Sequence, residues 1–181
     1  MKYETLDKRY FPTKGLKTNI SYTIYTNLHT NTAYSSLAAQ VTKIFPITLN
    51  TFIIPTIYGR FIFNDGIPFM YSNVIGGEGY NPHYEQQIPF SGLTHTESTL
   101  KLLGNAQIQV RHKFHEKQYL TLSGNYAIHQ NQFSNFLQGK KIYGTSIGYG
   151  YDSPLGPIEG FICYSNRTNK LGFYLNIGFG F

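Results

Sequence analysis

The sequence LGFYLNIGFGF, residues 171–181, decides the fold class. Large apolar side chains occupy every odd position from Leu171 to Phe181, whereas the even positions carry glycine, tyrosine or asparagine. A period of two is that of a β-strand, in which successive side chains point to opposite faces. The segment is therefore predicted to be a strand with one apolar face. This apolar set includes the last residue, where a soluble domain usually carries a polar side chain.

The same alternation recurs upstream and predicts an all-β fold. Residues 103–114 have one polar parity, which includes Gln107, and one apolar parity, which includes Ile108. Residues 119–129 repeat this pattern. Pro55 is expected to weaken the hydrogen-bond ladder of its own strand, because proline has no N–H to donate. With the further candidates, the chain has about eight antiparallel strands, an even number as in bacterial barrels: residues 15–26, 33–44, 51–63, 142–152 and 158–164.

Composition agrees with a strand-rich membrane protein. Charged residues make up 13% of the chain, against about 25% in a typical domain, and aromatic residues reach 17%. No apolar run approaches the roughly 20 residues of a membrane helix. The mean hydropathy of −0.27 still allows a barrel, because a polar lumen offsets an apolar exterior. The net charge of +6 is scattered, which argues against nucleic acid as a partner, and the single Cys163 excludes an internal disulfide and a cysteine-rich metal site.

Connection lengths give an independent test, because outer-membrane barrels have short periplasmic turns and longer extracellular loops. The connections on the side of Phe181 are all short: residues 152–156, 114–117 and 45–50. Two of those on the other side are long: residues 166–169, 129–140, 64–99 and 27–31. This asymmetry favours a transmembrane barrel over a soluble β-sandwich. Aromatic residues near the predicted strand ends suit the girdles of such a barrel: Tyr10, Phe11, Phe45, Phe114, Tyr119, Tyr149 and Tyr151.

The N-terminal sequence MKYETLDKRYFPTKG, residues 1–15, lacks the apolar segment of a secretory signal. For an outer-membrane protein, we therefore expect the chain to be a fragment or part of a longer gene product. Half of a larger barrel would leave two strand edges that lipid cannot satisfy. The strands are expected to close alone, to pair with a missing N-terminal half, or to pair with a second copy, and the sequence leaves these alternatives open.

The residues Asp7-Lys8-Arg9-Tyr10-Phe11-Pro12-Thr13-Lys14-Gly15 resemble the D-x-x-x-F-P-T-x-G lead-in of the BamA/TamA-like bacterial surface antigen superfamily. Residues 153–158 are similar to the turn before that family's penultimate strand. The resemblance implies the C-terminal half of a sixteen-stranded barrel, with a lead-in at 1–14, strands over 15–181 and a long extracellular or lumen-inserted loop at 64–99. It also implies a terminal signal read by the barrel assembly machinery: Gly172, Tyr174, Leu175, Ile177, Phe179 and Phe181.

Within that superfamily, residues 84–90 and 165–170 look most like the barrels of patatin-like phospholipases of Bacteroidota. This resemblance implies a parent protein with a lipid-acyl hydrolase upstream, while the chain itself is a non-catalytic anchor without a cofactor. The family's long loop usually carries an Arg-Gly-aromatic motif, whereas this chain has Glu78 where an arginine is looked for. The departure favours an anchor over an insertase or pore, and it lies in the loop motif Gly76, Gly77, Glu78, Gly79 and Tyr80.

The pentapeptide at 144–148, GTSIG, fits the G-x-S-x-G nucleophile pattern. A nucleophile elbow requires a strand-to-helix turn, but this pentapeptide lies within an alternating strand with no helix after it. Asp65-Gly66 is followed by Ile67, so the second half of a patatin dyad is also missing. The glycines at 144, 148 and 150 instead share one parity with Ser146, which predicts a smooth strip for the close approach of a plug or loop, or for strand curvature.

Two groups of polar residues remain. The first, His112, His115 and Glu116, is interpreted as a solvated turn rather than a metal site, because a zinc site needs three or four convergent ligands. The second consists of charges on the predicted lumen face that pair with Glu159 or with loop carboxylates, or alternatively form a basic lining that favours anions: Arg60, Arg111 and Lys113.

The sequence thus predicts an antiparallel barrel anchor in the bacterial outer membrane. Its expected partners are outer-membrane lipid, the barrel assembly machinery during insertion, and either the missing N-terminal barrel half or a second copy. Two alternatives stay open. One is an insertase or translocation pore that moves protein or lipid, and the other is a soluble β-barrel ligand-binding protein of the lipocalin kind.

Overall fold

A computed structural model describes residues 1–27, 32–64, 67–68, 71–77, 86–93 and 95–178. Nearly all of the regular structure is strand, with a short 3₁₀ helix, η2 (Phe133–Gln138), in one connection. In the described part of the chain, no helix is long and apolar enough to cross a bilayer. The strands are β1 (Lys2–Glu4), β2 (Gly15–Asn27), β3 (Thr32–Pro46), β4 (Thr51–Ile62), β5 (Asn73–Ile75), β6 (Gln87–Ile88), β7 (Glu97–Thr99), β8 (Leu102–His115), β9 (Gln118–Gln130), β10 (Lys140–Ser153), β11 (Gly156–Ser165) and β12 (Leu171–Ile177).

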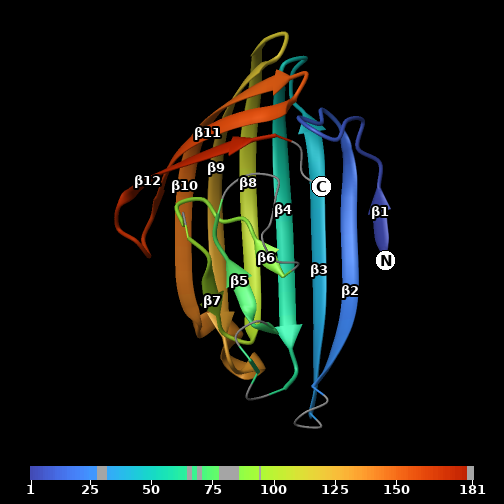
Figure 1. The fold of residues 1–181 in the computed structure, drawn as a ribbon, viewed down its shortest axis with the longest axis vertical. Helices are drawn as coiled ribbons and strands as arrows, with labels where there is room; N and C mark the ends of the chain where they lie inside the picture. Colours follow the sequence, from blue (N-terminus) through green and yellow to red (C-terminus); the bar gives the residue numbers. More distant parts are fainter. Residues whose placement is uncertain (28–31, 65–66, 69–70, 78–85, 94, 179–181) are drawn as a thin grey trace.

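Nine strands form one antiparallel sheet in the order β1-β2-β3-β4-β8-β9-β10-β11-β12. Each long strand pairs with its neighbour in the chain, so that the sheet is a continuous curved wall (Figure 1). The all-β antiparallel fold class is confirmed. Of the alternatives that the sequence leaves open, closure of these strands on themselves is not seen, because in the described residues β1 and β12 are the two edges and do not pair with each other. The ninth strand arises in the predicted lead-in, where Lys2 pairs with Asn19 of β2.

Pro55 interrupts one side of its strand, as the sequence predicts. The ladder between β3 and β4 reaches the pair Thr42 and Thr56 and resumes only at Phe45 and Ile53. Pro55 lies in this gap, since it has no N–H to donate to β3. On the other side of β4 the ladder with β8 is continuous and includes Pro55. The wall therefore stays intact around the proline.

The connection between β4 and β8 contains a second sheet of three short strands in the order β6-β5-β7. It lies against the concave side of the wall (Figure 1). We call this side the inner face, and the described residues 67–68, 71–77, 86–93 and 95–99 the inner-face loop. Their apolar side chains complete the main core with residues of β4, β8, β9 and β10: Tyr58, Ile75, Ile88, Phe90, Leu93, Leu103, Ala127 and Ile142.

Candidate functional site: the outer face and the inner-face loop

The convex outer face of the wall is apolar and exposed. On β9, Leu120 and Leu122 are 40% and 51% exposed, whereas the alternate residues Thr121 and Ser123 are buried. The alternation predicted for the other long strands is also present. On the outer face of the described strands, the charged side chains are Lys43 and Lys141, both near strand ends. Exposed outer-face residues include Ile20, Tyr22, Ile24, Leu37, Val41, Ile57, Ile108, Val110, Tyr126, Tyr143, Ile147, Ile162, Phe173 and Leu175.

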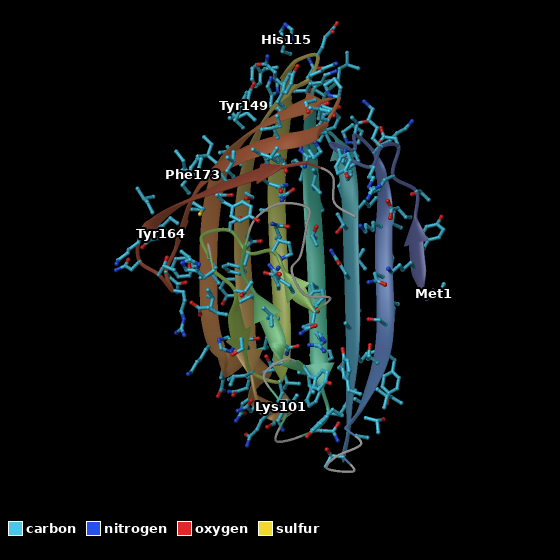
Figure 2. All side chains as sticks on the ribbon, viewed as in Figure 1. Met1, Lys101, His115, Tyr149, Tyr164 and Phe173 are labelled. Carbon is cyan, nitrogen blue, oxygen red and sulfur yellow. The ribbon has the colours of Figure 1, made fainter. Side chains whose placement is uncertain are left out.

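Only part of the predicted aromatic girdle lies on the outer face. Phe114 and Tyr149 are exposed there, with ring centroids 6.1 Å apart near the end of the wall that carries the short turns. In Figure 2, His115 marks this turn end and Lys101 marks the opposite loop end. The girdle prediction is wrong for Phe11 and Tyr119, which are buried and stack with centroids 4.2 Å apart.

Three serine hydroxyls join the inner-face loop to the wall. The Oγ atom of Ser91 in the loop lies 2.9 Å from Oγ of Ser123 on β9 and 3.2 Å from Oγ of Ser146 on β10. The Oγ atoms of Ser123 and Ser146 lie 2.6 Å apart. All three side chains are buried, so these hydrogen bonds satisfy groups that water does not reach. The sequence placed Ser123 and Ser146 on the polar parity, but nothing in it singled out Ser91.

The predicted glycine strip of β10 is the surface on which the loop packs. A Cβ atom added to Gly144 would lie 1.8 Å from the carbonyl oxygen of Ser91, and one added to Gly148 would lie 2.2 Å from the ring of Phe161. Gly150 likewise makes room for the ring of Phe11. The loop contributes Gly92, whose positive φ of 88° and contact with the Tyr164 carbonyl exclude a side chain. The strip thus admits one backbone segment and two aromatic rings.

Arg60 holds the start of the inner-face loop. Its side chain is buried on β4, and its Nη1 atom donates to the carbonyl of Ser72 at 3.2 Å and to Oδ1 of Asn73 at 3.0 Å. Its Nη2 atom donates to Oγ of Ser36 at 3.3 Å. Among the described residues no carboxylate pairs with Arg60, and main-chain and side-chain amide oxygens are its acceptors there. These neutral acceptors come from a loop whose path the sequence does not fix.

The other two predicted lumen charges lie on the inner face of β8. Arg111 is buried with its guanidinium carbon 5.4 Å from the centroid of the Phe11 ring, a cation–π geometry. Its Nε and Nη1 atoms have no hydrogen-bond partner in the described residues, so the predicted pairing with a carboxylate is not found there. Arg111 and Glu159 both line a cavity of about 260 Å³ between the lead-in and the wall. Lys113 is half-buried near the turn end.

The predicted assembly signal lies on the edge strand β12. Leu175 and Ile177 are exposed on its outer face, and Gly172 and Tyr174 occupy the other parity. The remaining residues of this signal, Phe179 and Phe181, lie outside the described residues. The structure therefore shows where four of these side chains lie, and the signalling role stays a prediction.

The predicted loop motif begins with two glycines in left-handed conformations. Gly76 and Gly77 have φ angles of 123° and 77°, and a Cβ atom on Gly76 would meet the carbonyl of His95 at 2.1 Å. Both glycines are therefore required by the local backbone. The rest of the motif, Glu78, Gly79 and Tyr80, lies outside the described residues.

The motifs that suggested chemistry occupy structural positions. Ser146 lies in the middle of β10, and its hydrogen-bond partners in the described residues are the hydroxyls of Ser91 and Ser123, neither of which is a base. His112 faces outward and its Nδ1 atom lies 2.9 Å from Oγ1 of Thr51. Among the described residues, no group of three or more His, Cys, Asp or Glu side chains could hold a metal ion.

The lead-in is folded around Asp7. Its carboxylate accepts hydrogen bonds from the amide of Thr13 at 2.8 Å, from the hydroxyl of Thr13, and from the amide of Lys14 at 3.2 Å. Partial burial acts to raise the pKa of Asp7, but these hydrogen bonds together hold it below its ordinary value. The turn directs the next residues of the lead-in inward, where Phe11 and Pro12 are buried.

Acidification is therefore expected to loosen this turn. The folded pKa of Asp7 lies below the unfolded value of about 3.9, so ionised Asp7 stabilises the turn above that pH, and the effect is lost as pH falls through the folded pKa. Hydrogen exchange of the Thr13 and Lys14 amides, followed against pH, checks this. Asp7→Asn should remove the pH dependence and Glu116→Gln in an exposed turn should not; identical pH profiles for all three proteins would contradict the prediction.

A wall of antiparallel strands with an apolar exterior and a loop packed on its inner face is typical of the outer-membrane β-barrel class. The model of the OMP85 superfamily matches residues 1–181, and the chain therefore belongs to this superfamily. Its members are bacterial outer-membrane β-barrel proteins that interact with the assembly machinery and with lipids. The resemblance seen in the sequence is confirmed at this level. No curated protein matches the chain.

Proposed function

We propose that the chain forms part of the wall of an outer-membrane β-barrel and anchors a bacterial surface protein in that membrane. The observation that carries this proposal is the apolar outer face, which continues over eight long strands from β2 to β12. Burial of apolar surface is worth about 25 cal/mol per Å², so leaving such a face in water is costly, whereas acyl chains cover it without ordering a partner protein.

The inner face supports an anchoring role. The inner-face loop covers part of this face, and Arg60, the serine hydroxyls and the glycine strip hold it at separate points of the wall. The contacts join the loop to β4, β9 and β10, so a wide passage along the inner face would require them to break. Conduction or transport is the rival function, and ion conductance in planar bilayers would favour it.

The finer part of the proposal is a parent protein with a patatin-like phospholipase upstream of this chain. The sequence motifs at 84–90 and 165–170 support it, and the wall itself acts only as the anchor. The catalytic serine and aspartate would then lie in the preceding part of the gene product. Reading the coding sequence upstream tests this part alone, because the anchor proposal stands whichever domain precedes it.

The edge of the sheet at β2 indicates that the wall pairs with a further barrel segment. Strand β1 is short, and its residues Lys2–Glu4 pair only with Lys17–Asn19 of β2. In the described residues, most of the edge of β2 that faces away from β3 therefore has no partner strand. Unpaired backbone groups at membrane depth are costly. We infer that another barrel segment, from the parent chain or from a second copy, pairs with this edge, and that the barrel assembly machinery and outer-membrane lipid are the other partners.

Adjacent residues on opposite faces of β8 test membrane insertion directly. The chain has no tryptophan, so a single introduced tryptophan reports alone. Ile108→Trp on the outer face is expected to lose most of its fluorescence in vesicles whose phospholipids carry bromine on the acyl chains. Gln107→Trp, at the same depth but facing the cavity, should be quenched far less.

Refolding the unmodified chain provides the control for this experiment. A soluble ligand-binding barrel would stay monomeric without detergent and would show equal fluorescence for both variants in brominated and ordinary vesicles. That result would overturn the proposed function. A chain that requires detergent, shows heat-modifiable gel mobility and distinguishes the two tryptophans supports it.

A further inference from the structure

The connection between β9 and β10 folds over the outside of the wall. A Cβ atom added to Gly104 would meet the ring of Phe136 at 3.0 Å, and Gly104 shares its strand parity with the exposed outer-face residues of β8. Phe61, on the outer parity of β4, packs against the same segment, with ring centroids 5.4 Å from Phe133 and 6.5 Å from Phe136. The helix η2 therefore lies against the outer face at the loop end.

This position leaves two apolar side chains largely exposed. Phe133 is 61% exposed and Leu137 is 76% exposed, although Phe136 between them packs on the wall. Shortly after η2 comes Lys141, exposed on the outer face at the start of β10, whereas Lys140 lies on the inner parity. An apolar pair followed by a cationic residue is the order in which a segment crosses from acyl chains to headgroups at a membrane surface.

We propose that residues 131–141 form an interfacial anchor that inserts into the outer-facing leaflet beside the wall. Phe133 and Leu137 lie among the upper acyl chains, and Lys141, on the outer face of β10, contacts phosphate groups of the lipid headgroups. The inference rests on the proposed function and adds a specific lipid contact to it. Two features favour lipid over a protein as the partner of this segment: the segment is continuous with the apolar outer face, and its cationic end matches anionic headgroups.

The segment also accounts for the small residues beneath it. Gly104 pairs with Gly59 of β4, which in turn pairs with Ala39 of β3, so that three small residues lie side by side on the outer face. The shallow strip lets the Phe136 ring lie close to the backbone of β8, since a Cβ atom on Gly104 would meet that ring.

Depth-dependent quenching tests the anchor. Leu137→Trp is expected to lose most fluorescence when bromine lies near the headgroup end of the acyl chain, whereas Ile108→Trp is expected to lose most with bromine near the bilayer centre. His115→Trp, at the tip of a turn, should respond to iodide in the water and not to brominated lipid. The vesicles are phosphatidylcholine with or without phosphatidylglycerol, and the full chain is used.

The lysines have a separate readout. With phosphatidylglycerol present, quenching of Leu137→Trp by shallow bromine is expected to increase; Lys141→Gln should abolish that increase, and Lys140→Gln on the inner parity should leave it. If Leu137→Trp is not quenched while Ile108→Trp is, the anchor is wrong and the proposed function stands. If neither variant is quenched, the interfacial anchor and the proposed function are both wrong. If Phe133→Ser with Leu137→Ser instead breaks a dimer in detergent, the segment is a contact between two copies and the anchor is wrong.

Discussion

Replacing Gly144 with valine is expected to lower the free energy of unfolding by about 3 kcal/mol or more and to lift the inner-face loop from the wall. The added Cβ would lie 1.8 Å from the carbonyl oxygen of Ser91. Both atoms are bonded directly to the main chain, so no side-chain rotation can relieve the clash. Neither β10, held by ladders to β9 and β11, nor the loop can move without losing hydrogen bonds. Urea unfolding in detergent, followed by circular dichroism, measures the loss.

Gly124→Val is the matched control. Gly124 pairs with Thr145, the residue next to Gly144, but it faces outward and nothing lies within 4 Å of an added Cβ. A substitution there is expected to change stability by less than about 0.5 kcal/mol. Limited proteolysis should cut within the inner-face loop of Gly144→Val and leave that of Gly124→Val intact. Equal stability of the two variants would show that the loop is not packed on the glycine strip.

The outer face could be predicted from the sequence because its signal is local. Leu122 and Ile147 each alternate with small or polar neighbours on the same strand, and lipid-facing positions require no knowledge of a partner strand. The glycine strip could be predicted for a similar reason, since several glycines of one parity leave a surface that some other segment must cover. The identity of that segment, residues around Ser91, depended on the path of a long loop.

Aromatic residues near strand ends were harder to place. Phe114 continues the apolar parity of its strand and is exposed outside, whereas Phe11, in the lead-in outside any alternating segment, is buried inside. The difference arises from a distant residue, because Gly150 lacks the side chain that would exclude the Phe11 ring and Tyr119 provides a stacking surface. Such long-range packing is not encoded in a period of two. The same limit applies to Arg60, because most of its acceptors belong to the loop.

Closure of the barrel also could not be predicted from the local sequence pattern of each strand. Each hairpin of the sheet follows from its own alternation and turn, but closure depends on whether the two edge strands meet. In the described residues β1 and β12 do not, although the eight long strands lie where the sequence placed them. The edge residues carry no signal for closure, since an exposed edge and a paired edge have the same alternation. A segment that pairs with β2 must therefore be found by experiment.

Arg60→Ala is expected to release the start of the inner-face loop and to cost about 3 kcal/mol or more in unfolding free energy. Each hydrogen bond from a charged donor contributes about 1.5–3 kcal/mol, and the substitution also leaves the buried acceptors of Asn73 and Ser36 without this donor. Hydrogen exchange is the sharper readout, because the amides of β5 should exchange faster while those of the long strands keep their protection.

Two further variants separate the role of Arg60 as a bridge from that of its charge. Arg60→Lys keeps the charge, but a single ammonium group cannot reach both Asn73 and Ser36 as the guanidinium does, so an intermediate loss is expected. Ser36→Ala removes one long hydrogen bond of 3.3 Å and should cost about 1 kcal/mol or less. If Arg60→Lys matches the unmodified chain in the exchange of β5, charge alone holds the loop. If Arg60→Ala leaves that exchange unchanged, the loop is held by the serine hydroxyls and the glycine strip, and the clamp assigned to Arg60 is wrong.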